Sequence, residues 1–186
     1  MRLFVAGVLP ERFCLELVQQ LEPVRAATPQ ARWLPAKALH LTLVFLGAVA
    51  DAVVAPLGAG LGSMVGRHHP LALSLAGMET FGPSRTPRVL ATALAGEVEG
   101  LRSLVADARQ VVQALVPLEP ERPFRPHLTV ARARSARGDP LLGRCRTALG
   151  ARLEGSFRLE DVALVRSETF ATGAVHTILE RWQLRG

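Results

Sequence analysis

The sequence predicts an α+β fold with two lobes, in which two antiparallel sheets line a central cleft and helices cover the outer faces. Two observations predict this fold. Apolar segments with the two-residue period of strands are interspersed with segments of helical period along the 186 residues. A short strand phrase, His-Leu-Thr followed by an aliphatic residue, occurs at 40–43 and again at 127–130. This loose duplication, with no long polar linker, predicts a single two-lobed domain over 1–186.

The first half of the chain alternates between the two periods. Phe13, Leu17 and Leu21 have helical spacing, and three prolines after them indicate a loop. Asp51 is a suitable N-cap for the helix that follows. The elements expected are a strand over 2–9, a helix over 11–21, an extended piece around 31–34, a strand over 39–46 and a helix over 53–65.

The second half contains the clearest helical pattern, with one apolar face over 97–116. Asp139 followed by Pro140 is typical of a capped helix start. The elements expected are strands over 70–79 and 88–94, the helix over 97–116, a strand over 127–133, a helix over 140–149, and strands over 155–167 and 174–184.

Composition indicates a folded globular protein, with 49% hydrophobic and 20% charged residues. No apolar run is long enough to cross a membrane, and we expect the protein to be cytoplasmic and a monomer. A single disulfide bridge is possible, but buried free thiols at Cys14 and Cys145 are the better interpretation. The net charge is +6, and the segment 122–152 holds eight arginines and one acid. Such a segment is expected to attract an anion such as RNA.

The repeated phrase places chemistry on one face of each strand. Side chains two residues apart point to the same side, about 6.6–6.8 Å apart along the strand. His40 and Thr42 therefore point together, opposite the aliphatic residues, and so do His127 and Thr129. Two such strands facing one another would surround a cavity with two imidazoles and two hydroxyls.

Paired imidazoles suit a reaction that needs a general base and a general acid together. Imidazole titrates near neutral pH, so one ring can accept a proton while the other donates one. Opening a phosphodiester is such a reaction, and threonine hydroxyls can bind the phosphate oxygens. A two-histidine metal site is the rival interpretation, but no third ligand is repeated in the phrases. We therefore expect no metal and no cofactor.

The two phrases and their flanks resemble the two-histidine phosphoesterase superfamily. "RLFVAGVLP", "RWLPAKALHLTLVFLG", "ETFGPSRTPRVLATAL", "RPFRPHLTVAR" and "LVRSETFATGAVHTILERWQL" follow its phrasing in order over the whole chain. The most similar group is the RNA 2′,3′-cyclic phosphodiesterases, formerly described as 2′-5′ RNA ligases. The resemblance implies the bilobal fold and metal-independent hydrolysis of RNA 2′,3′-cyclic phosphate ends, or of cyclic nucleotides, to 2′-phosphomonoesters.

The same resemblance assigns roles to individual residues. It makes His40 the proton donor to the leaving 3′ oxygen and His127 the base, whereas the chemistry alone leaves the two roles open. Thr42, Thr129 and Arg132 become phosphate binders. Strict alternation turns Arg132 away from His127, so its role requires a bulge or a strand end. By the same alternation Phe45 belongs to the core, unless its strand bulges.

Three further points stay open in the sequence. His176 stands where the family often has tyrosine, and either lines a cavity or sits on a sheet edge, the position that we favour. The runner-up activity is 2′-5′ end joining of RNA, which is the same chemistry in reverse. The third possibility is a non-catalytic module that binds nucleotides or RNA.

Overall fold

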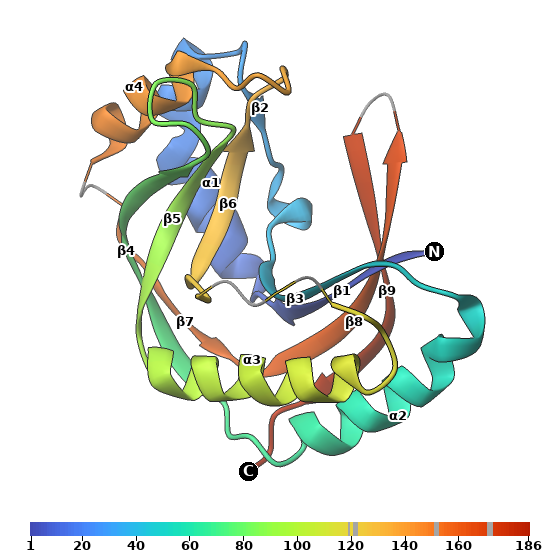
Figure 1. Ribbon diagram of the computed structural model, residues 1–186. Coiled ribbons are helices and arrows are strands. Elements are labelled where there is room, and N and C mark those ends of the chain that lie inside the picture. Colours follow the sequence, from blue (N-terminus) through green and yellow to red (C-terminus); the bar gives the residue numbers. More distant parts are fainter. Residues whose placement is uncertain (119, 121–122, 151–152, 171–172) are drawn as a thin grey trace.

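The computed structural model describes residues 1–118, 120, 123–150, 153–170 and 173–186. Its strands form two antiparallel sheets, with the orders β3-β1-β8-β9 and β2-β6-β5-β4-β7. Figure 1 shows the sheets curling around a common centre with helices outside them, which confirms the predicted fold class. The strands are β1 Arg2–Val8, β2 Arg32–Trp33, β3 Leu41–Ala48, β4 Leu71–Phe81, β5 Val89–Gly96, β6 His127–Arg132, β7 Ser156–Leu159, β8 Asp161–Phe170 and β9 Gly173–Gln183.

Helices cover the outer face of each sheet. Helices α2 and α3 pack on one another and on the four-stranded sheet, and α4 packs on the five-stranded sheet with α1 beside it. The helices are α1 Glu11–Ala27, α2 Val54–Val65, α3 Val98–Gln113 and α4 Pro140–Leu149, with 3-10 turns η1 Ala36–Ala38 and η2 Asp51–Val53. Asp139 caps α4, as predicted, by accepting a hydrogen bond from the Leu141 amide (2.8 Å).

Strand β1 separates the core from the cleft. Leu3 and Val5 are fully buried within the main hydrophobic core, which draws residues from both sheets. Phe4 and Ala6 point to the opposite side and pack on Ala163 and Val165 in a small separate cluster. Alternation along a central strand therefore gives the four-stranded sheet a second face, directed into the cleft. The single domain predicted over 1–186 stays a prediction.

Three predicted elements differ from the structure. Helix α1 continues past Pro23 to Ala27, because Val24 still packs on the core and the exposed proline costs only one backbone hydrogen bond. Asp51 caps no helix and lies 3.7 Å from the N-terminal amine instead. The strand expected over 155–167 is broken at Glu160, where the chain passes from one sheet to the other.

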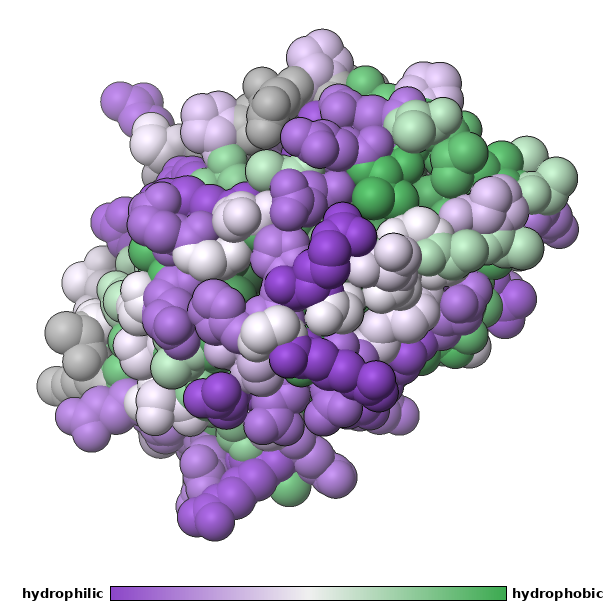
Figure 2. All heavy atoms as spheres, turned by 90° about the horizontal axis from the view of Figure 1, so that it is seen from below, coloured by the Kyte–Doolittle hydropathy of each residue, from purple (hydrophilic) through white to green (hydrophobic). Residues whose placement is uncertain are grey.

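The face that carries α2 and α3 is predominantly hydrophilic, and its hydrophobic surface gathers towards one side (Figure 2). Cys14 and Cys145 are buried and unpaired, as expected. Among the described residues, no helix combines the length and the hydropathy that crossing a bilayer demands.

Gly96 at the end of β5 is expected to be required for the fold. Its φ is +98°, and a Cβ there would lie 2.5 Å from the carbonyl oxygen of Ala72. Gly96→Ala should therefore lower the free energy of unfolding by about 1–3 kcal/mol in urea titrations. Gly143 lies within α4 with open space around its Cα, so Gly143→Ala should raise stability by about 0.5–1 kcal/mol. Equal effects of the two substitutions would contradict this expectation.

Candidate active site

Both His-Leu-Thr strands carry the same irregularity. The register of β3 against β1 shifts between Thr42 and Val44, and that of β6 against β5 shifts between Thr129 and Ala131. Each shift is a β-bulge, which places two successive side chains on the same face. Residues 40–45 and 127–132 accordingly share one burial pattern, in which the histidine and threonine are partly buried, the aliphatic residues are buried and the sixth residue is exposed.

The two bulges decide the orientation of the sixth residue in each strand. In β6 the bulge turns Arg132 to the side of His127 and Thr129, as its predicted phosphate role requires. In β3 it turns Phe45 out of the core, and the side chain is 54% exposed. The exception to core packing of Phe45, a bulge in its strand, is the one that the structure has, because alternation is interrupted at Leu43.

His40 is held by its own backbone and by an aromatic ring. Its Nδ1 lies 2.9 Å from the carbonyl oxygen of Ala38, and its ring packs on Phe4 at a centroid distance of 4.9 Å. A carbonyl can only accept, so Nδ1 carries the hydrogen and Nε2 is left for chemistry. Burial lowers the pKa of His40 to about 4, against the Ala38 hydrogen bond, which raises it.

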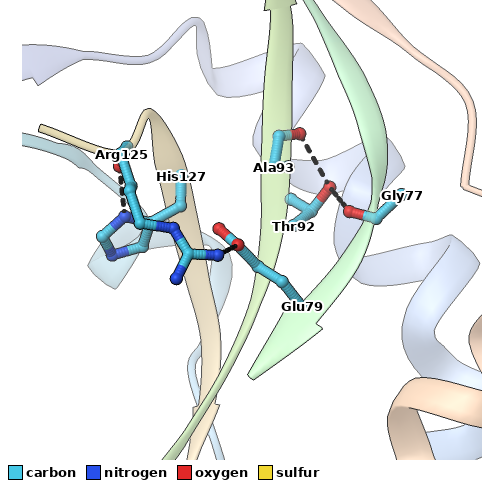
Figure 3. A network of polar contacts seen from close by, with 6 residues as sticks. All are labelled: Gly77, Glu79, Thr92, Ala93, Arg125 and His127. Carbon is cyan, nitrogen blue, oxygen red and sulfur yellow. Dashed lines mark hydrogen bonds and ion pairs between the residues drawn. The ribbon is translucent and has the colours of Figure 1, made fainter. Parts of the chain in front are cut away.

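His127 repeats this arrangement in the other sheet. Its Nδ1 lies 2.7 Å from the carbonyl oxygen of Arg125, and its ring packs on Phe81 at 4.5 Å. The guanidinium of Arg125 lies over the Phe81 ring, 4.7 Å from its centroid, and forms a salt bridge with Glu79. Figure 3 shows His127, Arg125 and Glu79 together. In His127, as in His40, Nδ1 is held by a carbonyl and Nε2 is left for chemistry. The charged side chains of Arg125 and Glu79 lie near its ring.

A buried hydroxyl stabilises strand β5, which pairs with β6. Thr92 is fully buried and donates one hydrogen to the carbonyls of Gly77 (3.1 Å) and Ala93 (3.2 Å), as Figure 3 shows. Gly77 lies where β4 bulges against β5. Thr92 therefore satisfies a carbonyl that the interrupted ladder leaves free, next to the strand of His127.

The two strands meet where the sheets approach one another. Strands β3 and β6 are in contact, and after burial the positive charges of His176, Arg132 and His127 lower the pKa of His40 further. His40 and Arg132 thus line the same cleft, and His127 lies nearby on β6, close enough for its charge to act on His40, without lining that cleft. Thr42 lies in the cleft wall, and Thr129, partly buried, shares a face with His127.

Two adjoining pockets open on either side of His40 and His176, which line both. The first, here called the apolar pocket, has a volume of about 550 Å³ and is lined chiefly by Phe4, Val8, Leu15, Val165 and Ile178. The second, here called the basic pocket, has a volume of about 740 Å³ and includes Arg2, Arg32, Lys37, Thr42, Phe45 and Arg132. The cleft therefore offers different chemistry on its two sides.

His176 belongs to the cleft, although β9 is an edge strand of its sheet. Its ring packs edge-on against His40 and against Phe4, both at 5.1 Å. Burial, and then Arg132, lower the pKa of His176. Within the described part of the chain its buried Nδ1 has no hydrogen-bond partner. His176 therefore lines a cavity, the alternative that we did not favour, although its strand lies at a sheet edge.

Sequence reasoning missed Arg2, Arg32 and the two phenylalanines that support the histidines. Within the arginine-rich segment, Arg132 lines the cleft and Arg125 lies beside His127. Arg134 bonds the Gln30 carbonyl, others lie on α4, and Arg122 and Arg152 fall outside the described residues. The available signal was the doubled aliphatic residue after each threonine, which is the mark of the bulge. No group of three or more potential metal-binding His, Cys, Asp or Glu side chains occurs among the residues described.

Comparisons with known proteins show which proteins this chain is similar to. The model of the 2′-5′ RNA ligase superfamily matches residues 9–169. A Thermus thermophilus protein named RNA 2′,3′-cyclic phosphodiesterase is 36% identical over 197 residues, covering 100% of this chain and 91% of the relative. A Methanothermobacter thermautotrophicus protein of the same name is 26% identical and covers 98% of each chain.

Solved structures with the same fold include proteins of this kind. A crystal structure of a Thermus thermophilus protein superposes with a TM-score of 0.81 at 32% identity, over 100% of this chain and 99% of that one. E. coli LigT complexed with NADP+ superposes with a TM-score of 0.74 at 26% identity, over 100% and 98%. The chain belongs to the 2′-5′ RNA ligase superfamily.

Proposed function

We propose that this protein hydrolyses the 2′,3′-cyclic phosphate ends of RNA to 2′-phosphomonoesters, without a metal ion. One observation carries the proposal. Two strands from different sheets, in contact with one another, carry histidine and threonine with the same burial pattern, and both histidines are fixed through Nδ1. Relatives over the whole chain bear the name of this activity.

The reaction needs one proton removed and one supplied. His127 Nε2 takes a proton from water, whose oxygen bonds to phosphorus as the bond from phosphorus to the 3′ oxygen breaks. His40 Nε2 donates its proton to that oxygen, which leaves a 2′-phosphomonoester. One proton has then moved from His40 to His127, and solvent restores both. The division of roles follows the family resemblance.

Arg132 and the two threonines bind the phosphate in this mechanism. A guanidinium forms charge-assisted hydrogen bonds with phosphate oxygens, and hydroxyls donate further ones. Negative charge increases on these oxygens as the water attacks, so the contacts strengthen in the transition state. The apolar pocket next to His40 suits the base of the terminal nucleotide.

The low pKa of His40 bears on its role as donor. In the free protein its ring is neutral at pH 7, because burial and neighbouring cations oppose a further positive charge. A cyclic phosphate brings a negative charge into the same cleft and so favours protonation. His40 therefore acquires its proton together with the substrate.

Either catalytic histidine should be indispensable. His40→Ala and His127→Ala should each lower kcat for adenosine 2′,3′-cyclic phosphate by about 10²–10⁴-fold, because each removes one proton-transfer group. Activity should persist in EDTA, and phosphorus NMR should identify a 2′-phosphate product. His69→Ala is the matched control, since His69 is an exposed histidine before β4 whose ring lies 3.8 Å from the Glu97 carboxylate. Full activity of either cleft variant, or a 3′-phosphate product, contradicts the mechanism.

Arg132 should contribute mainly through the phosphate. Arg132→Gln should lower kcat/KM by about 10–100-fold, since hydrogen bonds to charged groups contribute about 1.5–3 kcal/mol. Arg134→Gln serves as the control two residues away, where the side chain bonds the Gln30 carbonyl. Steady-state kinetics on the same substrate measures both. Equal losses would remove Arg132 from the proposal.

The pKa of His40 should appear in the stability of the protein. The unfolded chain binds this proton near pH 6.5 and the folded protein only near pH 4, so stability falls as the pH drops through that window. The full loss is on the order of 3–4 kcal/mol, at about 1.4 kcal/mol per pKa unit. Urea titrations from pH 7 to pH 4 should show this loss in the wild type and less of it in His40→Asn. Parallel pH profiles would show that the folded pKa of His40 is not lowered.

A further inference from the structure

The basic pocket holds more positive charge than the reacting phosphate requires. Arg2, Arg32, Lys37 and Arg132 line it, and no carboxylate does so among the described residues. A cyclic phosphodiester carries a single negative charge, and Arg132 together with the proton of His40 already balances it. At least two cations of this pocket therefore have no function in the proposed reaction itself.

Arg32, one of the surplus arginines, lies beside Arg132. Arg32 and Arg132 are paired across β2 and β6, and after burial the charge of Arg32 lowers the pKa of Arg132. In the part of the chain that the structure describes, Arg2, Arg32 and Arg132 form no salt bridge with a carboxylate. Like charges this close destabilise the free protein, and a bound anion relieves their repulsion.

An exposed aromatic ring lies in the same pocket. Phe45 is turned outward by the bulge of β3 and keeps 54% of its surface exposed. The guanidinium of Arg2 lies 5.7 Å from its centroid. The opposite wall carries the hydroxyls of Ser167 and Thr169 on the β8–β9 hairpin. Cations beside an exposed aromatic are the features that bind a single-stranded nucleic acid, by its phosphates and by base stacking.

We propose that the basic pocket binds the nucleotide that precedes the cyclic end, so that the preferred substrate is an RNA chain rather than a cyclic mononucleotide. Arg2 and Arg32 bind the phosphate that links the last two nucleotides, and the preceding base stacks on Phe45. The pocket includes His40 and Thr42, so the 5′ side of the terminal ribose can extend into it while the cyclic phosphate lies at His40. This inference rests on the proposed function.

Three substrates with the same cyclic end test the proposal. Adenosine 2′,3′-cyclic phosphate has no further phosphate, its 5′-phosphorylated form adds the phosphate alone, and the dinucleotide ApA with a 2′,3′-cyclic end adds the preceding nucleoside. The kcat/KM of the wild type should rise at each step, by about tenfold or more at the last one, since stacking on one aromatic contributes about 1–3 kcal/mol. Activity on the dinucleotide should also fall more steeply with salt, because it engages more cations.

Matched variants assign the gains to residues. Arg32→Gln should reduce the gain from the 5′-phosphate, and Phe45→Ala should reduce the gain from the second nucleoside, by about tenfold relative to the mononucleotide. Phe170→Ala is the control for Phe45, since Phe170 is also 54% exposed and lies outside the pocket. Arg12→Gln is the control for Arg32, on exposed α1 surface. Neither control should change the ratio between substrates.

The outcomes separate the two proposals. If the wild type hydrolyses all three substrates with equal kcat/KM, the proposed function stands and the nucleotide-binding pocket is refuted. A variant that lowers kcat/KM for all three substrates by the same factor refutes the role of that residue in the pocket. If the wild type hydrolyses none of them, the proposed function itself fails.

Discussion

The cleft depends on a bulge that directly follows the threonine in each of two strands. If β6 alternated strictly after His127, Val130 and Arg132 would lie on the same face. Either Arg132 would then be buried or Val130 would be exposed. The bulge avoids both results: Val130 and Ala131 stay fully buried and Arg132 reaches the cleft. The same device in β3 buries Leu43 and Val44 and turns out Phe45. Core packing and site geometry are therefore satisfied together.

The duplication also leads to a division of labour. Both histidines are oriented by a carbonyl two residues earlier and by a phenylalanine ring. Their surroundings then differ: His40 is buried beside His176 and near Arg132, whereas His127 lies beside Arg125 and Glu79. Beyond the threonines, one copy ends in an aromatic side chain and the other in a cation. A nearly symmetric framework thus supplies an asymmetric site, which suits a reaction with distinct acid and base.

Local pattern predicted the features that local pattern controls. The strand period placed His40 with Thr42 and His127 with Thr129, and helical spacing located the four main helices. The remaining features depend on pairing between distant segments. Neither the sheet change at Glu160 nor the approach of Arg2 and Arg32 to the cleft has a local signature, because each is set by long-range register. The doubled aliphatic residues mark the bulges locally, but the strands that pair with them lie far away in the sequence. His176 was misjudged because an edge strand can still direct one side chain inward.

The order of strands has a consequence for how the molecule forms. Strand β1 lies between β3 and β8, so the four-stranded sheet joins the beginning of the chain to a segment about 160 residues later. Such non-local pairing makes folding slow, since the loop must close before its contacts stabilise it. A nascent chain on the ribosome can pair β1 with β3 while the edge that awaits β8 stays open. His176 enters the cleft only when β9 joins, so the site is complete only after β9 has been synthesised.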